Sequence, residues 1–461
     1  MANKKSVVIV GAGPAGIFTA LELSKYKEID VVIVDKGKDI DKRLKGINGV
    51  YNGWGGAGAF SDGKLTFSTE TGGWLADYID EPALIDIMNA VDKTFLEYGA
   101  TEKVYGTQED SIAKIAREAA KADFRLIPSK VRHLGSDQCP IILQNIRRDL
   151  ERKVDILMET EIEKVEVENR VVKGVRTIDG RTIPADFVVL APGRSGANWL
   201  RKEAERLGLN SSVNPVDLGV RVEVPAEVLE PLTSVLYEPK LVYYSKSFDD
   251  KVRTFCVNPH GYVVEEKIND LVTVNGHSYL EKGSENTNFA ILVSTQFTQP
   301  FKDPIAYGMY IAKLANLLVN GVMIQRLGDL EIGRRSTHER ISRSITKPTL
   351  KTAQPGDLSF VLPGRYLTDI KEMLKALDRI APGIYSNHTL IYGIEVKFYS
   401  SRPKLTRNLE TEVNNLFTIG DGAGITRGLV QSSASGLIVS REILRRIERA
   451  NLPQSFHKQR P

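Results

Sequence analysis

The stretch Gly11-Ala12-Gly13-Pro14-Ala15-Gly16 decides the fold. Residues 6–10 before it are a short apolar run rich in β-branched side chains, which is typical of a buried parallel strand. Residues 17–24 after it predict a helix, and residues 31–34 predict a second buried strand that ends at Asp35. This order predicts a βαβ unit whose glycine turn lies at the carboxyl end of its first strand.

Each of the three glycines in this turn stands at a position where a side chain would interfere. Gly11 permits a tight turn, Gly13 leaves the backbone open to a pyrophosphate, and Gly16 lets the helix pack close to the strand. The helix start adds N–H groups and a positive dipole end for the phosphates. Asp35 follows Gly16 by 19 residues, where a carboxylate can accept hydrogen bonds from a ribose diol. The turn predicts a dinucleotide site, either FAD or NAD(P), with a purely structural βα turn as the alternative. We expect Gly13→Val to abolish binding.

The composition is that of an ordinary globular protein. The chain has 461 residues, 42% of them hydrophobic and 26% charged, which suffices for two or three domains. Its net charge of +4 is far below that of a dedicated nucleic-acid binder. Cys139 and Cys256 form no CxxC pair, so neither a dithiol centre nor a metal site is predicted. With no recognisable signal peptide or long apolar run, we expect a cytoplasmic protein without a membrane span.

A second glycine-rich stretch occupies residues 49–66. So many glycines disfavour a helix or strand interior and suit a loop pressed against a flat or anionic group. Trp54 and Phe60 disfavour the alternative, a flexible surface loop, because such a loop needs no large aromatic side chains. We therefore expect this loop to cover a cofactor. Lys64 could reach the cofactor or its phosphates, or could be solvated.

The next part of the chain mixes helices and strands. Residues 74–122 predict helices, and a further helix from about residue 140 to 151 is expected to have its cap at Ser136 or Asp137. Residues 154–190 are β-rich, with alternating charged and apolar side chains and a hairpin turn signal at Asp179-Gly180. The last of these strands runs into a second glycine turn, where a ligand could bind.

The sequence pattern changes at residue 212. Residues 212–390 contain strand-like pieces and no second glycine fingerprint, which predicts an inserted antiparallel-sheet α+β domain for the substrate. The pieces are 218–224, 241–244, 254–257, 262–265, 271–275 and 288–294, with helices at 303–319 and 366–380. Residues 415–424 then return to a buried strand and a glycine-rich acidic turn. The predicted fold class is α/β, with a Rossmann-like domain formed by residues 1–211 and 391–461.

Three pieces of the chain share one pattern, an apolar strand that runs into a glycine turn. They are the first turn with Asp35, residues 188–193 and residues 417–421. Together they resemble the FAD-binding superfamily typified by glutathione reductase and p-hydroxybenzoate hydroxylase, although Pro192 stands where that superfamily has Thr. There the acid of the third turn contacts the ribitol or pyrophosphate, and the next helix points its start at the flavin pyrimidine edge. The resemblance implies these roles for Asp421 and for residues 426–431.

The resemblance extends to a family of FAD-dependent dehydrogenases that is largely assigned by sequence. It rests on residues 60–65, 133–137, 284–288 and 420–428, and so covers almost the whole chain. It implies an FAD-containing oxidoreductase and leaves the substrate open. The residues expected at the FAD are Gly11, Gly13, Pro14, Ala15, Gly16, Asp35, Lys36, Gly55, Gly56, Ala57, Lys64, Ile162, Ala191, Gly193, Gly420, Asp421, Thr426, Gly428, Leu429 and Val430.

The catalytic residues are not marked by any motif. Candidates for a proton donor near the flavin are Lys64, His260 and His277, with a hydrogen-bonded turn residue as the favoured alternative for each histidine. Cys139 could be a thiolate at a helix start, but buried packing is favoured for it. Plain sheet roles are favoured for the polar residues of the strand-like run 391–397.

The densest basic stretch, residues 333–343, could bind an anionic substrate, a nicotinamide phosphate or RNA, or could be a solvated loop. The leading function is an FAD-dependent dehydrogenase or reductase that acts on a small organic substrate. NAD(P)H bound transiently, or a protein electron carrier, could exchange electrons with it. The alternatives are a flavin-dependent monooxygenase, an FAD-containing RNA-binding or RNA-modifying protein, and a non-catalytic flavoprotein. The oligomeric state is not predicted.

Overall fold

The computed structural model describes residues 4–44, 52–212, 214–268, 271–280, 283–295, 303–397, 400 and 402–451. The chain forms two compact units, and each is discontinuous in sequence. Unit 1 comprises Met1–Thr101, Asp137–Ser212 and Ser400–Pro461, and unit 2 comprises Glu102–Ser136 and Val213–Tyr399. The first residues of the predicted glycine loop, 49–51, lie outside the described residues.

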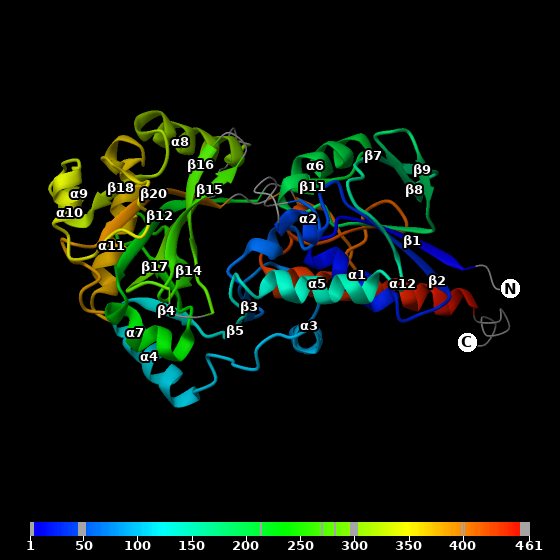
Figure 1. The fold of residues 1–461 in the computed structure, drawn as a ribbon, viewed down its shortest axis with the longest axis horizontal. Coiled ribbons are helices and arrows are strands. Elements are labelled where there is room, and N and C mark those ends of the chain that lie inside the picture. The colour runs from blue at the N-terminus through cyan, green and yellow to red at the C-terminus, as the bar shows by residue number, and fades with distance from the viewer. Residues whose placement is uncertain are drawn as a thin grey trace. The chain divides into compact units, whose positions relative to one another are not determined.

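Unit 1 is built on a parallel five-stranded sheet in the order β22-β10-β1-β2-β6 (Figure 1). Its strands are β1 (Lys5–Val10), β2 (Ile29–Val34), β6 (Asp155–Leu157), β10 (Phe187–Leu190) and β22 (Leu416–Thr418). In register, Val8 of β1 lies between Val32 of β2 and Val188 of β10. All residues of β10 and β22 are buried, and this is why these strands are continuous apolar runs rather than alternating ones.

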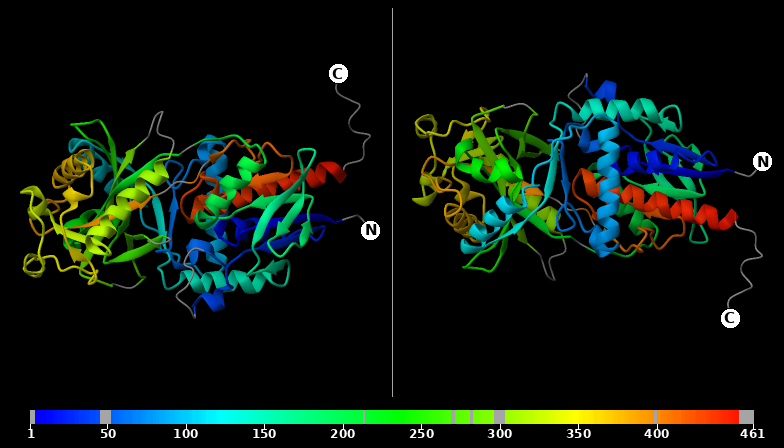
Figure 2. Two further views of the ribbon diagram at one scale, coloured as in Figure 1. Left: turned by 90° about the horizontal axis from the view of Figure 1, so that it is seen from above. Right: turned by 90° about the horizontal axis from the view of Figure 1, so that it is seen from below.

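Two helices of unit 1 pack closely together. α1 (Pro14–Leu23) connects β1 to β2, and α12 (Leu429–Asn451) follows β22. Figure 2 shows α12, in red, running beside α1, in blue. A β-carbon at Gly436 of α12 would lie only 2.4 Å from the carbonyl oxygen of Ala15. The two helices can therefore approach this closely only because residue 436 has no side chain.

Unit 1 also contains smaller elements. These are α2 (Ile40–Leu44), α3 (Glu81–Glu97), α5 (Cys139–Leu150), α6 (Ala197–Arg206), β3 (Lys64–Phe67), β7 (Ile162–Glu168), β8 (Val171–Thr177), β9 (Thr182–Pro184), β11 (Ser211–Ser212) and β21 (Arg402–Pro403). β7, β8 and β9 form an antiparallel sheet, and Gly180 makes the β8–β9 turn with a φ of 86°. The predicted cap of α5 is wrong. This helix begins after Gln138 without a side-chain cap, and Pro140 lies in its first turn.

Unit 2 is built on an eight-stranded sheet in the order β19-β18-β20-β12-β17-β14-β13-β4. Its strands are β4 (Phe124–Ile127), β12 (Val216–Pro225), β13 (Lys240–Tyr244), β14 (Lys251–Asn258), β17 (Asn286–Thr295), β18 (Met323–Arg326), β19 (Gln354–Pro355) and β20 (Leu390–Lys397). β18 and β19 pair in parallel, and the other neighbours pair antiparallel. The unit also contains β5 (Lys130–His133), the hairpin β15 (Tyr262–Ile268) and β16 (Leu271–His277), and the helices α4 (Glu109–Lys121), α7 (Ala226–Leu236), α8 (Pro304–Val319), α9 (Leu327–Glu331), α10 (His338–Ser342) and α11 (Gly364–Leu377).

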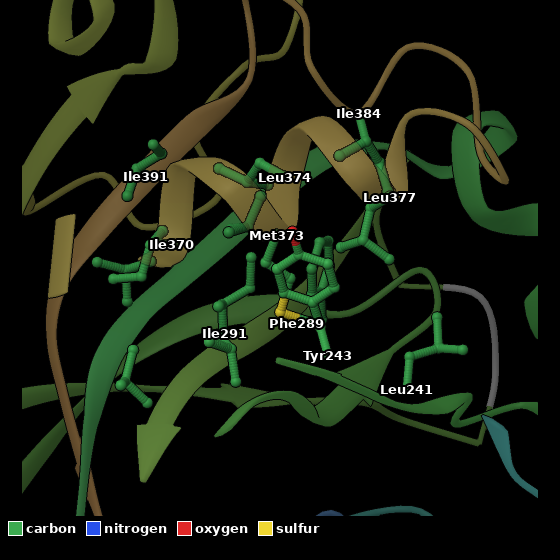
Figure 3. Close-up of a cluster of buried hydrophobic side chains, with 14 of the residues drawn as sticks. Leu241, Tyr243, Phe289, Ile291, Ile370, Met373, Leu374, Leu377, Ile384 and Ile391 are labelled. Atoms are coloured by element: carbon green, nitrogen blue, oxygen red, sulfur yellow. The ribbon is translucent and has the colours of Figure 1, made fainter. Parts of the chain in front are cut away.

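An apolar core covers one face of this sheet. α11 lies over the sheet and turns its buried side chains toward Phe289 and Ile291 of β17 (Figure 3). The side chains of α11 in this contact are Ile370, Met373, Leu374 and Leu377. β12 contributes Val220 and Val222, which are also fully buried. The spacing of these residues follows from period two in the strands and about 3.6 in the helix.

The structure forms a strand at each of the six pieces predicted between residues 218 and 294, and helices close to the two predicted at 303–319 and 366–380. α7 and β18 were not predicted. The predicted three-part domain division and the compact units differ at residues 102–136 and 391–399, which were both expected in the FAD-binding domain. The reason is strand pairing within unit 2, where β4 pairs with β13, and β20 pairs with β12 and β18.

We expect Phe289→Ala to destabilise unit 2 by about 3–5 kcal/mol, because it removes a fully buried ring from a packed core. Phe360→Ala is the matched control. Its ring is 73% exposed, and we expect a change within about 0.5 kcal/mol. Urea unfolding followed by circular dichroism measures both. Equal, small losses for the two variants would contradict the packing described for this core.

Candidate functional site

The first glycine turn lies between β1 and α1, where two glycines allow close backbone contacts. Gly11 has a φ of 115°, and a β-carbon there would lie 2.0 Å from the carbonyl oxygen of Ala191, at the end of β10. A β-carbon at Gly16 would lie 1.9 Å from the carbonyl oxygen of Gly11. Both glycines are therefore required by the protein's own packing, as their predicted turn and packing roles demand.

Gly13 is different, because among the described residues no atom crowds the position of its β-carbon. It has a φ of −81°, and a β-carbon there would meet only the Cα of Gly56, at 4.0 Å. Gly13 is also the N-cap of α1, and no side chain caps this helix. The backbone N–H groups of the first helical turn thus lie beside an open position, as a bound phosphate requires.

Asp35 lies at the end of β2 and accepts hydrogen bonds from three backbone N–H groups. Its Oδ2 accepts from Ala12 at 2.8 Å. Its Oδ1 accepts from Gly37 at 2.7 Å and from Gly53 at 2.9 Å. The sequence predicts a ribose acceptor here. The structure shows a carboxylate that joins the first turn, the end of β2 and the glycine loop.

The glycine loop is ordered against the first turn. The Gly55 N–H donates to the carbonyl oxygen of Ala12 at 2.7 Å. Trp54 is fully buried, and its Nε1 donates to the carbonyl oxygen of Leu143 at 2.9 Å. The buried guanidinium of Arg43 donates to the carbonyl oxygens of Trp54 and Gly56. The alternative of a flexible surface loop is therefore wrong for the described part of this loop.

Arg43 is a residue that sequence reasoning missed. It lies in α2, burial lowers its pKa to about 10, and Asp35 opposes this shift. It is therefore charged at neutral pH, and its Cζ lies 4.8 Å from the centre of the Phe60 ring. The sequence carries no signal for it, because Arg43 stands among several basic residues with nothing to show that it alone is buried.

The second and third turns contact each other and the first turn. A β-carbon at Gly422 would lie 2.5 Å from the carbonyl oxygen of Gly193. A β-carbon at Gly420 would lie 3.1 Å from the Cβ of Ala15 in α1. With the contact between Gly11 and Ala191, the three turns touch pairwise at the carboxyl edge of the parallel sheet. In the described part of the chain, no atom lies within 4 Å of a β-carbon position at Gly193, so its surroundings are open like those of Gly13.

Asp421 lies in the third turn, where Thr426 Oγ1 donates to its Oδ1 at 2.9 Å. Burial raises the pKa of Asp421 above its usual range, while Arg194 and Arg427 oppose this rise. Gly428, with a φ of 115° and no neighbour at its β-carbon position, begins the turn into α12.

The other residues expected at the FAD differ in how far they are buried. Leu429 packs near Gly58 of the glycine loop, and Val430 is buried. Ile162 is buried at the start of β7. Lys36 is exposed, with its Nζ 3.8 Å from a carboxylate oxygen of Glu161.

The structure places Lys64 and Ala57 near the end of the glycine loop. Ala57 is half-buried in the short helical turn Gly56–Phe60. The Lys64 side chain is only 5% exposed, and its Nζ lies 2.8 Å from Asp62 Oδ2. The alternative of a solvated lysine is therefore wrong. Cys139 is also buried, which raises its pKa to about 12 and removes the argument for a thiolate.

The two candidate histidines lie in unit 2 and make local hydrogen bonds. His260 Nδ1 lies 3.0 Å from the carbonyl oxygen of Ser284, and the His260 backbone has a φ of 51°. His277, at the end of β16, has its Nδ1 3.3 Å from Ser136 Oγ. Nothing in these contacts distinguishes either histidine as a proton donor to a bound cofactor.

A buried polar network that was not predicted lies in unit 2. Arg221 of β12 forms a two-pronged ion pair with Glu395 of β20, at 2.7 and 2.8 Å, and both side chains are fully buried. The other N–H groups of Arg221 donate to Asn288 Oδ1, the carbonyl oxygen of Cys256 and Asn275 Oδ1. All five N–H donors of this guanidinium are thereby used.

Glu223, two residues along β12, is the centre of a second buried group. It accepts hydrogen bonds from Tyr392, Thr349 and Asn286. Burial raises the pKa of Glu223, and these hydrogen bonds oppose the rise. The Lys397 Nζ is buried too, 3.0 Å from Glu395. Tyr392 and Lys397 therefore hold the polar face of the sheet together, rather than serving only as strand residues.

The basic stretch 333–343 lies in unit 2, and most of its residues are exposed. It contains the short helix α10, capped by Thr337. Arg334 Nε lies 2.7 Å from Asp329, and Arg340 donates to the carbonyl oxygen of Arg335. Arg335 and Arg343 remain exposed, as both a solvated loop and an anion-binding loop would have them. Within the described ranges, no cluster of three or more His, Cys, Asp or Glu residues is placed to hold a metal ion.

The family follows from comparison with known proteins. Residues 6–264, more than half of the chain, match the model of the family described as FAD dependent oxidoreductase. The chain belongs to the FAD-dependent oxidoreductase family. Residues 215–398 of this oxidoreductase also match the model described as FAD-dependent protein, C-terminal domain-like.

This flavoprotein is similar to a bacterial relative and to solved oxidoreductase structures. It is 26% identical over 487 residues to an uncharacterized protein of Clostridium beijerinckii, covering 98% of this chain and 82% of that protein. L-proline dehydrogenase from P. horikoshii aligns at a TM-score of 0.43 and 14% identity, covering 98% of this chain and all of that one. Glycine oxidase from Geobacillus kaustophilus aligns at a TM-score of 0.40 and 16% identity, covering 96% and 95%.

The geometry of unit 1 fits the cofactor of this oxidoreductase. FAD carries a pyrophosphate, which needs backbone N–H groups beside positions without side chains. Gly13 and Gly193 provide such open positions at the ends of β1 and β10, and Gly428 provides one before α12. No helix within the described parts of the chain is long and apolar enough to cross a membrane.

We expect Gly13→Ala to weaken FAD binding and Gly16→Ala to lower the stability of the fold. The Gly13→Ala methyl group meets no protein atom closer than 4.0 Å, so the fold should be kept while FAD affinity falls by about tenfold or more. The Gly16→Ala methyl group would lie 1.9 Å from a carbonyl oxygen, so this variant should lose about 1–3 kcal/mol of stability.

Thermal unfolding of the apoproteins and FAD titration separate the two effects. The larger Gly13→Val variant should bind no FAD, as the sequence predicts. Wild-type FAD affinity in Gly13→Ala would contradict the assignment of this position to the cofactor.

Proposed function

We propose that the three glycine turns of unit 1 hold FAD in the manner of the glutathione reductase and p-hydroxybenzoate hydroxylase superfamily. The single observation that carries this proposal is the pairwise contact of the three turns, with open glycine positions at Gly13, Gly193 and Gly428. The first turn and the start of α1 bind the pyrophosphate through backbone N–H groups. Asp421 contacts the ribitol or pyrophosphate, and its carboxylate can accept a hydrogen bond from a ribitol hydroxyl group.

When bound, FAD supplies the redox chemistry, and the chain binds and tunes it. α12 begins at Leu429, just after Gly428, and its first turn carries no acidic side chain. The positive end of this helix stabilises negative charge on a reduced flavin. The chain's own contribution at this end is therefore electrostatic and requires no protein nucleophile.

We propose that the reaction is a dehydrogenase or reductase reaction on a small organic substrate, with unit 2 as the substrate domain. NAD(P)H binds only transiently, because one dinucleotide fingerprint is present in the sequence and it is used for FAD. Neither Cys139 nor Cys256 forms a disulfide, which fits a reducing compartment, and we propose a cytoplasmic location.

Purification of the native protein tests this function directly. We expect a flavin absorption spectrum with about one FAD per chain, as a built cofactor site requires. NADH and NADPH are then added separately under anaerobic conditions, and bleaching of the flavin band identifies the electron donor. Dithionite serves as the positive control for reduction.

The outcomes are distinct. A colourless protein that takes up no added FAD would contradict the proposed site. NADPH oxidation coupled to oxygen uptake and a hydroxylated product would favour a monooxygenase instead. Gly13→Val, which should not hold FAD, is the matched control for non-specific flavin.

A further inference from the structure

We propose that Asp35 is a positioning residue, which holds the glycine loop 52–60 against the first turn and supports FAD binding through this loop. This inference rests on the proposed function, because it concerns the same cofactor site. It differs from the ribose-contact role that the sequence suggests for this acid.

The hydrogen bonds of Asp35 carry the inference. Its three donors, Ala12, Gly37 and Gly53, come from three separate segments at distances of 2.7–2.9 Å. A carboxylate has about four acceptor positions, so these bonds leave about one, on Oδ2. A ribose diol that donates both hydroxyl groups needs two. Asp35 can therefore contact one ribose hydroxyl group, while most of its hydrogen-bonding capacity holds protein backbone.

The backbone around these bonds is closely packed. A β-carbon at Gly37 would lie 2.2 Å from the Gly53 nitrogen. Gly53 has a φ of 97°, and a β-carbon there would lie 2.2 Å from the carbonyl oxygen of Lys38. These segments touch backbone to backbone, and the Asp35 carboxylate fills the hydrogen-bonding needs of both.

Arg43 also holds this loop, through carbonyl groups rather than N–H groups. It donates to the carbonyl oxygens of Trp54 and Gly56, whereas Asp35 accepts from the Gly53 N–H. The Gly55 N–H donates to the carbonyl oxygen of Ala12. Bonded N–H and carbonyl groups thus alternate along residues 53–56. Together they place the Cα of Gly56 4.0 Å from the β-carbon position of Gly13.

The backbone of the loop consequently faces the first turn across the proposed phosphate site, which we call the phosphate cradle. If it moved away, the first turn would keep its own N–H groups but lose the facing backbone. Because the anchors are protein groups, the cradle exists before FAD binds. Asparagine at position 35 would keep one acceptor oxygen and turn an NH₂ group toward N–H donors, which weakens the anchor without adding bulk.

The experiment compares Asp35→Asn with Asp30→Asn, an exposed acid of the same strand that pairs with Lys4. Amide hydrogen exchange is measured on both FAD-stripped proteins, together with the dissociation constant for FAD. Asp35→Asn should speed exchange at Ala12, Gly37 and Gly53 by about tenfold or more, and weaken FAD binding by a similar factor. Asp30→Asn should change neither.

A ligand analogue separates positioning from ribose contact. FAD that lacks the adenosine 2′- and 3′-hydroxyl groups should lose affinity in Asp35→Asn by nearly the same factor as FAD does. If Asp35 acts through the ribose, the substitution should cost nothing with this analogue. Weaker FAD binding with unchanged exchange would overturn the proposal, as would faster exchange with unchanged FAD affinity, which marks a merely structural role.

The wild-type apoprotein provides a test that does not depend on a variant that folds. The Gly37 and Gly53 amides should exchange slowly without FAD, and fast exchange would overturn the proposal. Failure of the wild-type protein to bind FAD would refute the proposed function, while the exchange pattern would still decide whether Asp35 anchors the loop.

Discussion

Backbone contacts that only glycine permits are the constraint on which unit 1 depends. A β-carbon at Gly11, Gly16, Gly422 or Gly436 would fall within 2.5 Å of a carbonyl oxygen. These contacts join β1 to β10, α1 to its own turn, the second turn to the third, and α1 to α12. Hence the glycines that look like ligand-binding residues are first of all packing residues. Gly13 differs, because its surroundings are open and no packing requirement explains it.

The features of unit 1 that depend on neighbouring residues can be predicted from the sequence, and those that depend on distant residues cannot. The βαβ unit and the strand ends at Ala191 and Gly420 follow from local patterns, since apolar runs and glycine turns are legible over a few residues. The anchors of the glycine loop do not follow. Gly53 bonds to a carboxylate 18 residues earlier, and Trp54 to a carbonyl 89 residues later. Such partners are chosen by the tertiary fold, on which a single sequence carries no local signal.

Unit 2 shows a different limit of sequence reasoning. β12 alternates apolar residues with Asp217, Gly219, Arg221 and Glu223, a pattern typical of a strand with one face in water. In the structure Arg221 and Glu223 are fully buried. The hairpin β15–β16 lies against this face, since a β-carbon at Gly276 would lie 2.3 Å from the Arg221 guanidinium. The sequence predicts the strand at 218–224, but its pattern does not show that the polar face is covered.

The buried network also restricts where substrate recognition can take place. A buried arginine in a proposed substrate domain is an obvious candidate for binding a carboxylate. Here every N–H group of Arg221 already has an acceptor, and Glu395 takes two of them. A substrate carboxylate could bind only by displacing one of these acceptors, which would leave a buried polar group unpaired at a cost of about 1–3 kcal/mol. Displacing Glu395 would cost more, because its charge would remain in the interior. Arg221 therefore holds β12, β14, β16, β17 and β20 together, and substrate specificity must come from other side chains, whose hydrogen-bonding groups the fold has not already used.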